Sequence, residues 1–152
     1  MACVLLTGCA SGGAGHGDAA VRLVPPRPAP AASRYCAALT RTLPARLGGH
    51  PRRAVRPGSS LTVAWGNPPV TLRCGVPLPA ALTPTAELTV VNGVSWFPQP
   101  PGAATPTQFI EVGREAYVEL TIPASYAPAG PLLVAISNAI VAVIPAKTGG
   151  QI

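Results

Sequence analysis

The segment Leu88-Thr89-Val90-Val91-Asn92-Gly93-Val94-Ser95-Trp96-Phe97 carries the clearest structural signal in this chain of 152 residues. Two runs rich in β-branched and aromatic residues, 88–91 and 94–97, are separated by only two residues. Asn-Gly accepts the left-handed backbone conformation that a tight type I′ turn requires at both central positions. The segment therefore predicts a β-hairpin, from which the rest of the sheet can be placed.

The same pattern occurs once on each side of this hairpin. Strand-forming runs at 61–65 and 70–74 flank Gly66-Asn67-Pro68-Pro69, and runs at 108–112 and 115–122 flank Gly113-Arg114. The first of these linkers is a turn sequence, and Gly at the first position of the second suits a type II′ turn. Three consecutive hairpins predict an antiparallel meander of about five or six strands.

A helix is predicted before the sheet. It would start after Ser33 as N-cap, because apolar residues then recur every three or four positions, at Cys36, Leu39, Leu43 and Leu47. Pro44 would interrupt or kink this helix, and Gly48-Gly49 would close it. The segment 50–60 would be a loop rich in Arg and Pro.

A second helix is predicted after the sheet. The apolar run 132–144 follows Gly130-Pro131 and ends at Pro145. A bilayer needs about 20 residues, so this run is too short to span one. It predicts a helix packed on the sheet, with a buried strand as the alternative because of its Val and Ile content. The fold class expected is α+β, with a helix at each end of an antiparallel sheet.

The N-terminal sequence Leu6-Thr7-Gly8-Cys9 matches the end of a bacterial lipoprotein signal, in which the cysteine receives a diacylglyceryl group. Only eight residues precede Cys9, and none of them is Lys or Arg. A full signal has a basic segment followed by a longer apolar segment. We predict a signal remnant at 1–8, a flexible Gly/Ala/Pro tether at 9–33, one globular domain at 34–146 and a tail at 147–152. Lipidated Cys9, with acyl chains such as palmitate, would hold the domain at the outer face of the cytoplasmic membrane. A secreted chain without lipid and a cytosolic chain are the alternatives.

The cysteines divide by position. Cys3 lies in the predicted signal and Cys9 at the predicted lipid site, which leaves Cys36 and Cys74 in the domain. Outside the cytoplasm such a pair oxidises, so we predict a Cys36–Cys74 disulfide. Two buried free thiols are the alternative.

The charge is unevenly distributed. Between Ala19 and Ala86 the chain has nine arginines and no Asp or Glu. Such a basic half predicts binding to an anionic lipid or wall polymer, with Arg52, Arg53 and Arg56 as the densest cluster. The alternative is that these arginines only keep the domain soluble. Nucleic acid is not expected as a partner, because only Tyr35 and Trp65 lie among these arginines, too few for a base-stacking surface.

Four motifs occur in an order that points to a known family: Trp65-Gly66-Asn67-Pro68, Leu72-Arg73-Cys74-Gly75, Val91-Asn92-Gly93-Val94-Ser95-Trp96 and Glu115-Ala116-Tyr117-Val118-Glu119-Leu120-Thr121-Ile122-Pro123. Together with the tether and Cys36, they resemble the domain of unknown function 3515 family over about 35–145. The resemblance implies an exported protein or lipoprotein of high-GC Gram-positive bacteria. It implies no activity, cofactor or catalytic residue.

Catalytic chemistry has few candidate residues in the domain. His50 is its only histidine, and the only aspartate of the chain, Asp18, lies in the predicted tether, so a Ser-His-Asp triad cannot be assembled in the domain. Glu115 and Glu119 of the last hairpin would share one strand face, with Glu111 on the other, and could serve a cell-envelope hydrolase. The alternative is a solvated face near Arg114. No metal cluster, phosphate loop or dinucleotide fingerprint occurs in the sequence, so we predict no metal and no cofactor.

The aromatic residues offer a binding surface instead. Trp65 and Trp96 lie at strand ends, where they would line a groove for a glycan or a partner peptide, or else pack in the core. The sequence therefore predicts a non-catalytic binding or accessory module of the cell envelope, with a membrane and an envelope protein as partners. The envelope hydrolase is the alternative.

Overall fold

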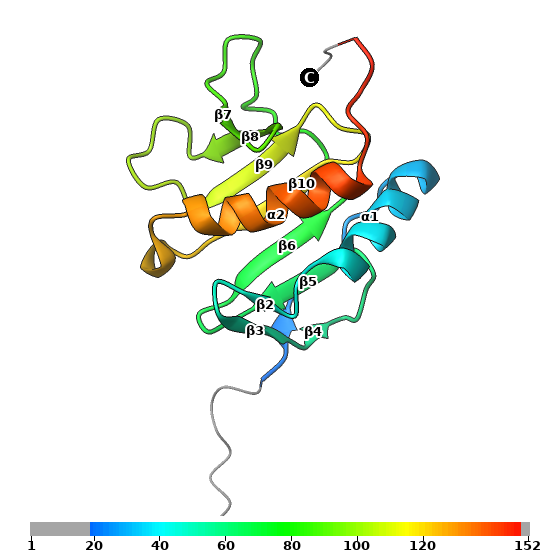
Figure 1. Ribbon diagram of the computed structural model, residues 1–152, viewed down its shortest axis with the longest axis vertical. Helices are drawn as coiled ribbons and strands as arrows, with labels where there is room; N and C mark the ends of the chain where they lie inside the picture. The colour runs from blue at the N-terminus through cyan, green and yellow to red at the C-terminus, as the bar shows by residue number, and fades with distance from the viewer. Residues whose placement is uncertain (1–18, 150–152) are drawn as a thin grey trace, which may run out of the picture.

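The computed structural model describes residues 19–149, which form a sheet with two helices side by side on one of its faces (Figure 1). The helices are α1 (Pro30–Thr42) and α2 (Gly130–Val143), with a short 3-10 helix η1 (Ala124–Tyr126). The strands are β1 (Val21–Arg22), β2 (Arg46–Leu47), β3 (His50–Arg53), β4 (Val55–Arg56), β5 (Thr62–Trp65), β6 (Val70–Cys74), β7 (Thr89–Val91), β8 (Val94–Gln99), β9 (Gln108–Val112) and β10 (Val118–Thr121). The predicted α+β class is confirmed.

The hairpin at Asn92-Gly93 is confirmed. Val91 pairs with Val94, and Asn92 and Gly93 have φ angles of 48° and 76°. Both central residues are thus in the left-handed region, as a type I′ turn requires. The other four predicted strands also form, β6 and β9 with the predicted bounds and β5 and β10 with shifted ends.

The strand order departs from a single meander. The main sheet has eight strands in the order β2-β3-β5-β6-β10-β9-β8-β7, and neighbouring strands are antiparallel. The segment 75–88 carries the chain from β6 to the far edge, and β7 to β10 then return to β6. Leu72 of β6 pairs with Leu120 of β10, and both are 0% exposed. This order therefore puts two apolar strands at the centre of the sheet.

The predicted two-residue turn at Gly113-Arg114 is wrong. Glu119 pairs with Ile110, so β9 and β10 are joined by a loop over 113–117. Within this loop Ala116 is buried, and Arg114 donates hydrogen bonds to the carbonyl oxygens of Ile144 and Gly93. The loop is longer because it also closes the end of the helical layer.

The N-terminal part of the domain also differs from expectation. α1 begins at Pro30, before Ser33, and it ends at Thr42 because Leu43 adopts the extended conformation favoured before a proline. Leu47 is buried in β2 instead of lying on the helix. The predicted loop 50–60 contains β3, which pairs with β5 and adds, with β2, two strands to the expected number.

Part of the predicted tether is structured. Within 19–33 lie the first residues of α1 and the strand β1, which pairs in parallel with β4. The backbone N–H of Val21 donates to the carbonyl oxygen of Ala54 at 2.8 Å. In the structure, the ordered chain therefore starts well before residue 34.

The main core lies between the sheet and the helices. α2 buries Leu132, Leu133, Ile136 and Ile140 against strand residues such as Val118. This confirms the predicted C-terminal helix and removes the strand alternative. Within residues 19–149, neither helix combines the length and the apolar character needed to cross a membrane.

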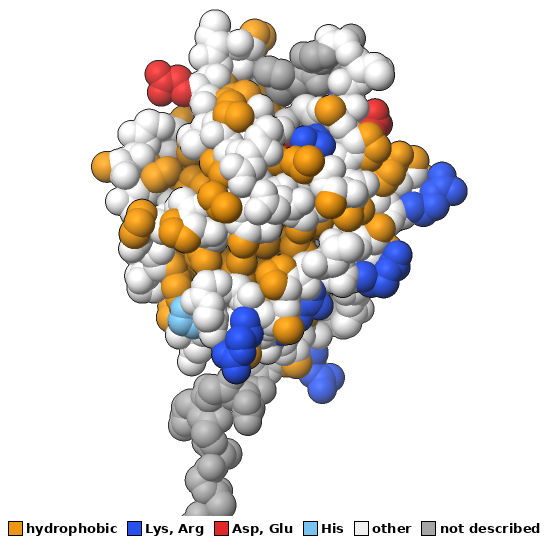
Figure 2. Space-filling model, in the orientation of Figure 1, with side chains coloured by type: hydrophobic (Ala, Val, Ile, Leu, Met, Phe, Trp, Pro, Cys, Tyr) orange, Lys and Arg blue, Asp and Glu red, His pale blue; other side chains and the backbone are white. Residues whose placement is uncertain are grey.

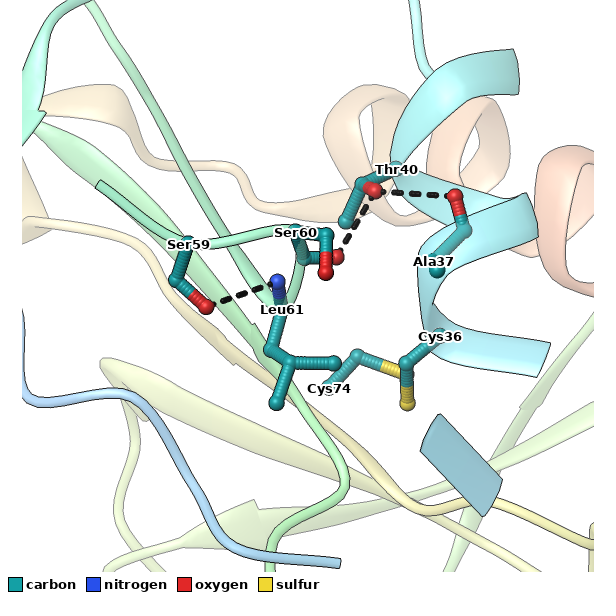
Figure 3. The surroundings of a disulfide bond; sticks show 7 residues. All are labelled: Cys36, Ala37, Thr40, Ser59, Ser60, Leu61 and Cys74. Carbon is teal, nitrogen blue, oxygen red and sulfur yellow. Dashed lines mark hydrogen bonds between the residues drawn. A yellow bond between two sulfur atoms is a disulfide. The ribbon is translucent and has the colours of Figure 1, made fainter. Parts of the chain in front are cut away.

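The Cys36–Cys74 disulfide is confirmed and links α1 to the end of β6 (Figure 3). Both cysteines are 0% exposed, and their Cα atoms are 5.4 Å apart. Beside the bridge, the Thr40 hydroxyl donates to the carbonyl oxygen of Ser60, which fixes the same helix to the segment before β5. The first helix is thus held to the sheet by one covalent link and a nearby hydrogen bond.

Candidate functional site

The predicted arginine cluster is divided by the fold, and Arg52 has a structural role. Its guanidinium donates to the carbonyl oxygens of Leu43 at 2.7 Å, Thr40 at 2.9 Å and Pro44 at 3.1 Å. These carbonyls belong to the end of α1, whose partial negative charge favours a cation. The guanidinium carbon also lies 5.9 Å from the ring centroid of Trp65. Most of the hydrogen-bonding capacity of Arg52 is therefore used within the protein.

Arg53 and Arg56 are placed differently. Arg53 donates to the carbonyl oxygens of Gly66 and Ala19, so it connects β3 to the start of the described chain. Arg56 in β4 is exposed. The three residues therefore do not present one free basic cluster, and only Arg56 remains a simple surface cation.

The exposed arginines nevertheless gather at one end of the molecule. Figure 2 shows most of the visible Lys and Arg along the lower and right-hand edges, over β2 to β4 and α1, with one further basic side chain at the upper end, where the visible Asp and Glu also lie. The described chain begins at the same lower end, beside β1 (Figure 1). We call the region from this lower end along α1 the basic pole, and its exposed members are Arg22, Arg34, Arg41, Arg46 and Arg56.

The predicted aromatic groove is not formed. Trp65 and Trp96 are 0% exposed and belong to the core beneath the helices. Their indole N–H groups donate to the carbonyl oxygen of Pro44 and to the hydroxyl of Ser137, respectively. Side chains alternate between the two faces of a sheet along a strand, and the positions of both tryptophans in their strands place them on the face that the helices cover.

A different groove lies on the opposite face of the sheet. Two adjoining pockets of about 390 and 480 Å³ share Arg73, Val76 and Pro77 among their lining residues. We call them together the Arg73 groove. Its polar floor comes from four neighbouring strands, β6, β10, β9 and β8, and consists of Arg73, Glu119, Gln108 and Gln99.

Two non-strand segments border the Arg73 groove. Residues 77–80 line the smaller pocket, and residues 26–29 line the larger one. Pro28 of the second segment packs on Gly75, which has a φ angle of 92° and no room for a Cβ atom. A side chain at Gly75 would come within 2.5 Å of the Pro28 ring. The glycine therefore allows the N-terminal segment to form one border of the groove.

An ion pair defines the chemistry of the floor. Arg73 and Glu119 face each other across β6 and β10, and Arg73 Nη1 donates to Glu119 Oε1 at 3.1 Å. The Arg73 side chain is 32% exposed and that of Glu119 is 13% exposed. The pair is thus only partly covered, and it fixes the guanidinium in the groove.

Two buried donors of the groove have no partner within residues 19–149. They are Arg73 Nε and the Gln99 side-chain amide nitrogen Nε2. A buried N–H group without a partner costs about 1–3 kcal/mol, so both atoms favour a bound hydrogen-bond acceptor. The sequence search missed Gln99 and Gln108, although the strand alternation places both on the face of Glu119.

The predicted glutamates do not come together. Glu119 lies in the smaller pocket, whereas Glu115 lies on the exposed loop and lines the larger pocket. Glu111 is 0% exposed on the helical face, and burial raises its pKa to about 8, against the nearby positive charges of Arg114 and Lys147. Since Glu111 lines neither pocket of the groove, it cannot act on a ligand there.

Other predicted features need only brief placement. Cys9 lies outside the described residues. Within the described part of the chain, no group of three or more His, Cys, Asp or Glu side chains is arranged to hold a metal ion. His50 packs edge-on against the ring of Tyr126, with centroids 4.8 Å apart.

A family model described as "Protein of unknown function (DUF3515)" matches residues 1–149. This match confirms the resemblance carried by the sequence motifs. No curated protein and no solved structure matches the chain. The chemistry of the molecule therefore has to be inferred from its own residues.

Proposed function

The chain belongs to the DUF3515 family, and from this premise we propose that it is a non-catalytic binding module of the cell envelope. A lipid on Cys9 would hold it at the outer face of the cytoplasmic membrane, with the basic pole toward the membrane and the Arg73 groove open to a partner. The observation that carries the proposal is the concentration of exposed arginines on β1, β2, β4 and α1. The basic pole includes the end where the described chain begins.

The disulfide supports an exported location. Disulfides persist in oxidising compartments and are rare in the cytosol of ordinary bacteria. The bridge between Cys36 and Cys74 is buried and therefore serves structure rather than redox chemistry. A bridge of this kind stabilises the folded domain mainly by restricting the unfolded chain.

The groove supports binding more than catalysis. Glu119 is engaged by Arg73, and Glu115 lies on an exposed loop in the neighbouring pocket. A hydrolase that uses both glutamates needs them on opposite sides of one scissile bond. The observed floor instead presents an ion pair and amide groups, which suit recognition of a polar ligand.

The lipid anchor makes the first prediction. When the chain is expressed in a bacterial host with a complete signal before it and with labelled palmitate, the wild type should take up label and remain with membranes. Cys9→Ala should lose the label and leave the membrane fraction, because two or more acyl chains are required for stable anchoring. Cys3→Ala is the matched control and should behave as the wild type. Equal labelling of wild type and Cys9→Ala would contradict the anchor.

The basic pole makes the second prediction. The unlipidated chain, Cys9→Ala, should bind vesicles containing phosphatidylglycerol at low salt and should not bind neutral phosphatidylcholine vesicles. Each basic residue near an anionic membrane contributes about 1 kcal/mol, so changing Arg34, Arg41 and Arg56 together to Gln should lower affinity at least about tenfold. Arg52 is left intact because its contacts hold α1.

The vesicle experiment has a second arm. A phosphate-bearing wall polymer in solution offers the same anionic chemistry as the lipid headgroups. Preferential binding to this polymer would show that the basic pole binds the cell wall instead of the membrane. Equal binding to anionic and neutral vesicles, or no effect of the three substitutions, would refute the proposed orientation.

A further inference from the structure

We propose that the Arg73 groove binds an extended, uncharged peptide segment, with Arg73 and Gln99 donating hydrogen bonds to its main-chain carbonyl oxygens. This inference rests on the proposed function as a binding module and specifies the ligand class of its groove.

The free donors select for an acceptor. Arg73 Nε and Gln99 Nε2 are both N–H groups, buried and without a partner among the residues that the structure describes. The Arg73–Glu119 contact uses Nη1, so it orients the guanidinium and leaves Nε unpaired. A small rotation of the two side chains toward the groove would bring each donor to a peptide carbonyl oxygen, which would form the missing hydrogen bond.

The charge balance selects against an anion. Arg73 is paired with Glu119 in the smaller pocket, and Arg27 and Glu115 both line the larger one. A carboxylate or phosphate in the groove would meet Glu119 as well as Arg73. An uncharged acceptor avoids this repulsion and still uses the two donors.

The shape of the groove suits an extended chain. β6 and β8, which carry Arg73 and Gln99, are separated by β10 and β9, so their backbones are about 14 Å apart at about 4.8 Å per strand. A peptide of about four residues spans this distance at about 3.3 Å per residue. Pro77 and Pro79 border the smaller pocket and have no N–H group to compete for the peptide's acceptors.

A saccharide is the competing ligand, and the lining disfavours it. Sugar rings are commonly held against exposed aromatic faces. Among the lining residues of the two pockets, the one aromatic is Tyr117, whose hydroxyl already accepts a hydrogen bond from Lys147. The smaller pocket, which holds both free donors, is lined instead by aliphatic, proline and polar side chains.

The test is an NMR titration of the full chain carrying Cys9→Ala. The peptide probe is acetyl-tetraalanine amide, and the saccharide probe is the N-acetylglucosamine trimer. The peptide should shift the Arg73 Hε and Gln99 side-chain amide signals in a saturable way. For a ligand held by a few hydrogen bonds, saturation is expected at peptide concentrations of up to about 10 mM. The trimer should leave both signals in place.

Two substitutions separate binding from folding. Arg73→Lys keeps a positive charge beside Glu119 but removes the Nε donor, and Gln99→Met keeps the approximate shape but removes the amide. Each should weaken peptide binding by about tenfold, while thermal stability stays near that of the parent because the lost donors have no internal partner. Val90→Ala, at a side chain that is 67% exposed on β7 and outside the groove, is the control and should change neither property.

The inference fails if the saccharide and not the peptide shifts the two signals, if neither probe does, or if both variants bind the peptide as well as the parent. If a variant unfolds, the signal shifts measured on the parent protein decide the question alone. Lipid labelling and vesicle binding do not involve the groove. Their success together with a failed titration would overturn the peptide assignment and leave the anchored module intact.

Discussion

Removal of the Cys36–Cys74 disulfide should lower the free energy of unfolding by about 4 kcal/mol. The bridge closes a loop with a sequence separation of 38 residues, and the loss of that constraint raises the entropy of the unfolded chain by this order. The measurement is urea unfolding of Cys36→Ala with Cys74→Ala against the oxidised parent, both without Cys3 and Cys9. A native domain of this size has about 5–15 kcal/mol in total, so the double variant should be close to unfolding.

The loss should be concentrated in α1. This helix buries only Cys36, Leu39 and Thr40, so the disulfide supplies a large part of its attachment to the sheet. Amide hydrogen exchange in 30–42 should therefore accelerate more than exchange in β6 and β10. A double variant with the unfolding midpoint of the parent, or with uniform acceleration throughout the domain, would show that the bridge does not hold the helix.

Local patterns in the sequence predicted local structure well. Asn92-Gly93 specifies its hairpin because the turn and both strands lie within ten residues, and Pro131 marks the start of α2 for the same reason. The Cys36–Cys74 pair followed from elimination among four cysteines. For the hairpin and the helix, the residues that determine the structure are close in the sequence. For the disulfide, the number of possible partners is small.

Contacts between distant segments were beyond prediction. Nothing in 70–74 indicates that its free edge pairs with 118–121 rather than with the next strand in sequence. Arg52 looked like a surface cation because the carbonyl oxygens that bind it, at the end of α1, approach it only in the folded chain. The Arg73 groove was missed for the same reason, since its floor combines four strands and its borders come from 26–29 and 77–80.

Burial of Glu111 is the other structural feature with a large expected effect. The side chain is 0% exposed on the helical face of β9, opposite Trp96 in register, and the backbone N–H of Arg114 is near its carboxylate without forming a hydrogen bond of good geometry. Burial raises its pKa from 4.5 to about 8, although Arg114 and Lys147 oppose the shift. The charged form is thus disfavoured in the folded protein.

The direction of the pH effect follows from this shift. Between about pH 4.5 and 8 the folded protein keeps the Glu111 proton and the unfolded chain releases it. Stability should therefore fall as the pH rises through this window, by roughly 5 kcal/mol at 1.36 kcal/mol per pKa unit, and level off above pH 8. The stabilising contribution of the protonated carboxyl is fully present below about pH 4.5.

Glu111→Gln isolates this contribution, because the amide has nearly the shape of the protonated acid and does not ionise. At pH 4 the variant and the parent should have similar unfolding free energies. At pH 9 the variant should be more stable by several kcal/mol, and the difference should grow between these limits. Urea unfolding at steps of one pH unit gives the comparison, with titrations of all other groups cancelling between the two proteins. A constant difference across the whole range would mean that Glu111 reaches solvent or a partner when charged, and the buried, unpaired carboxyl would then be an incorrect description of this core.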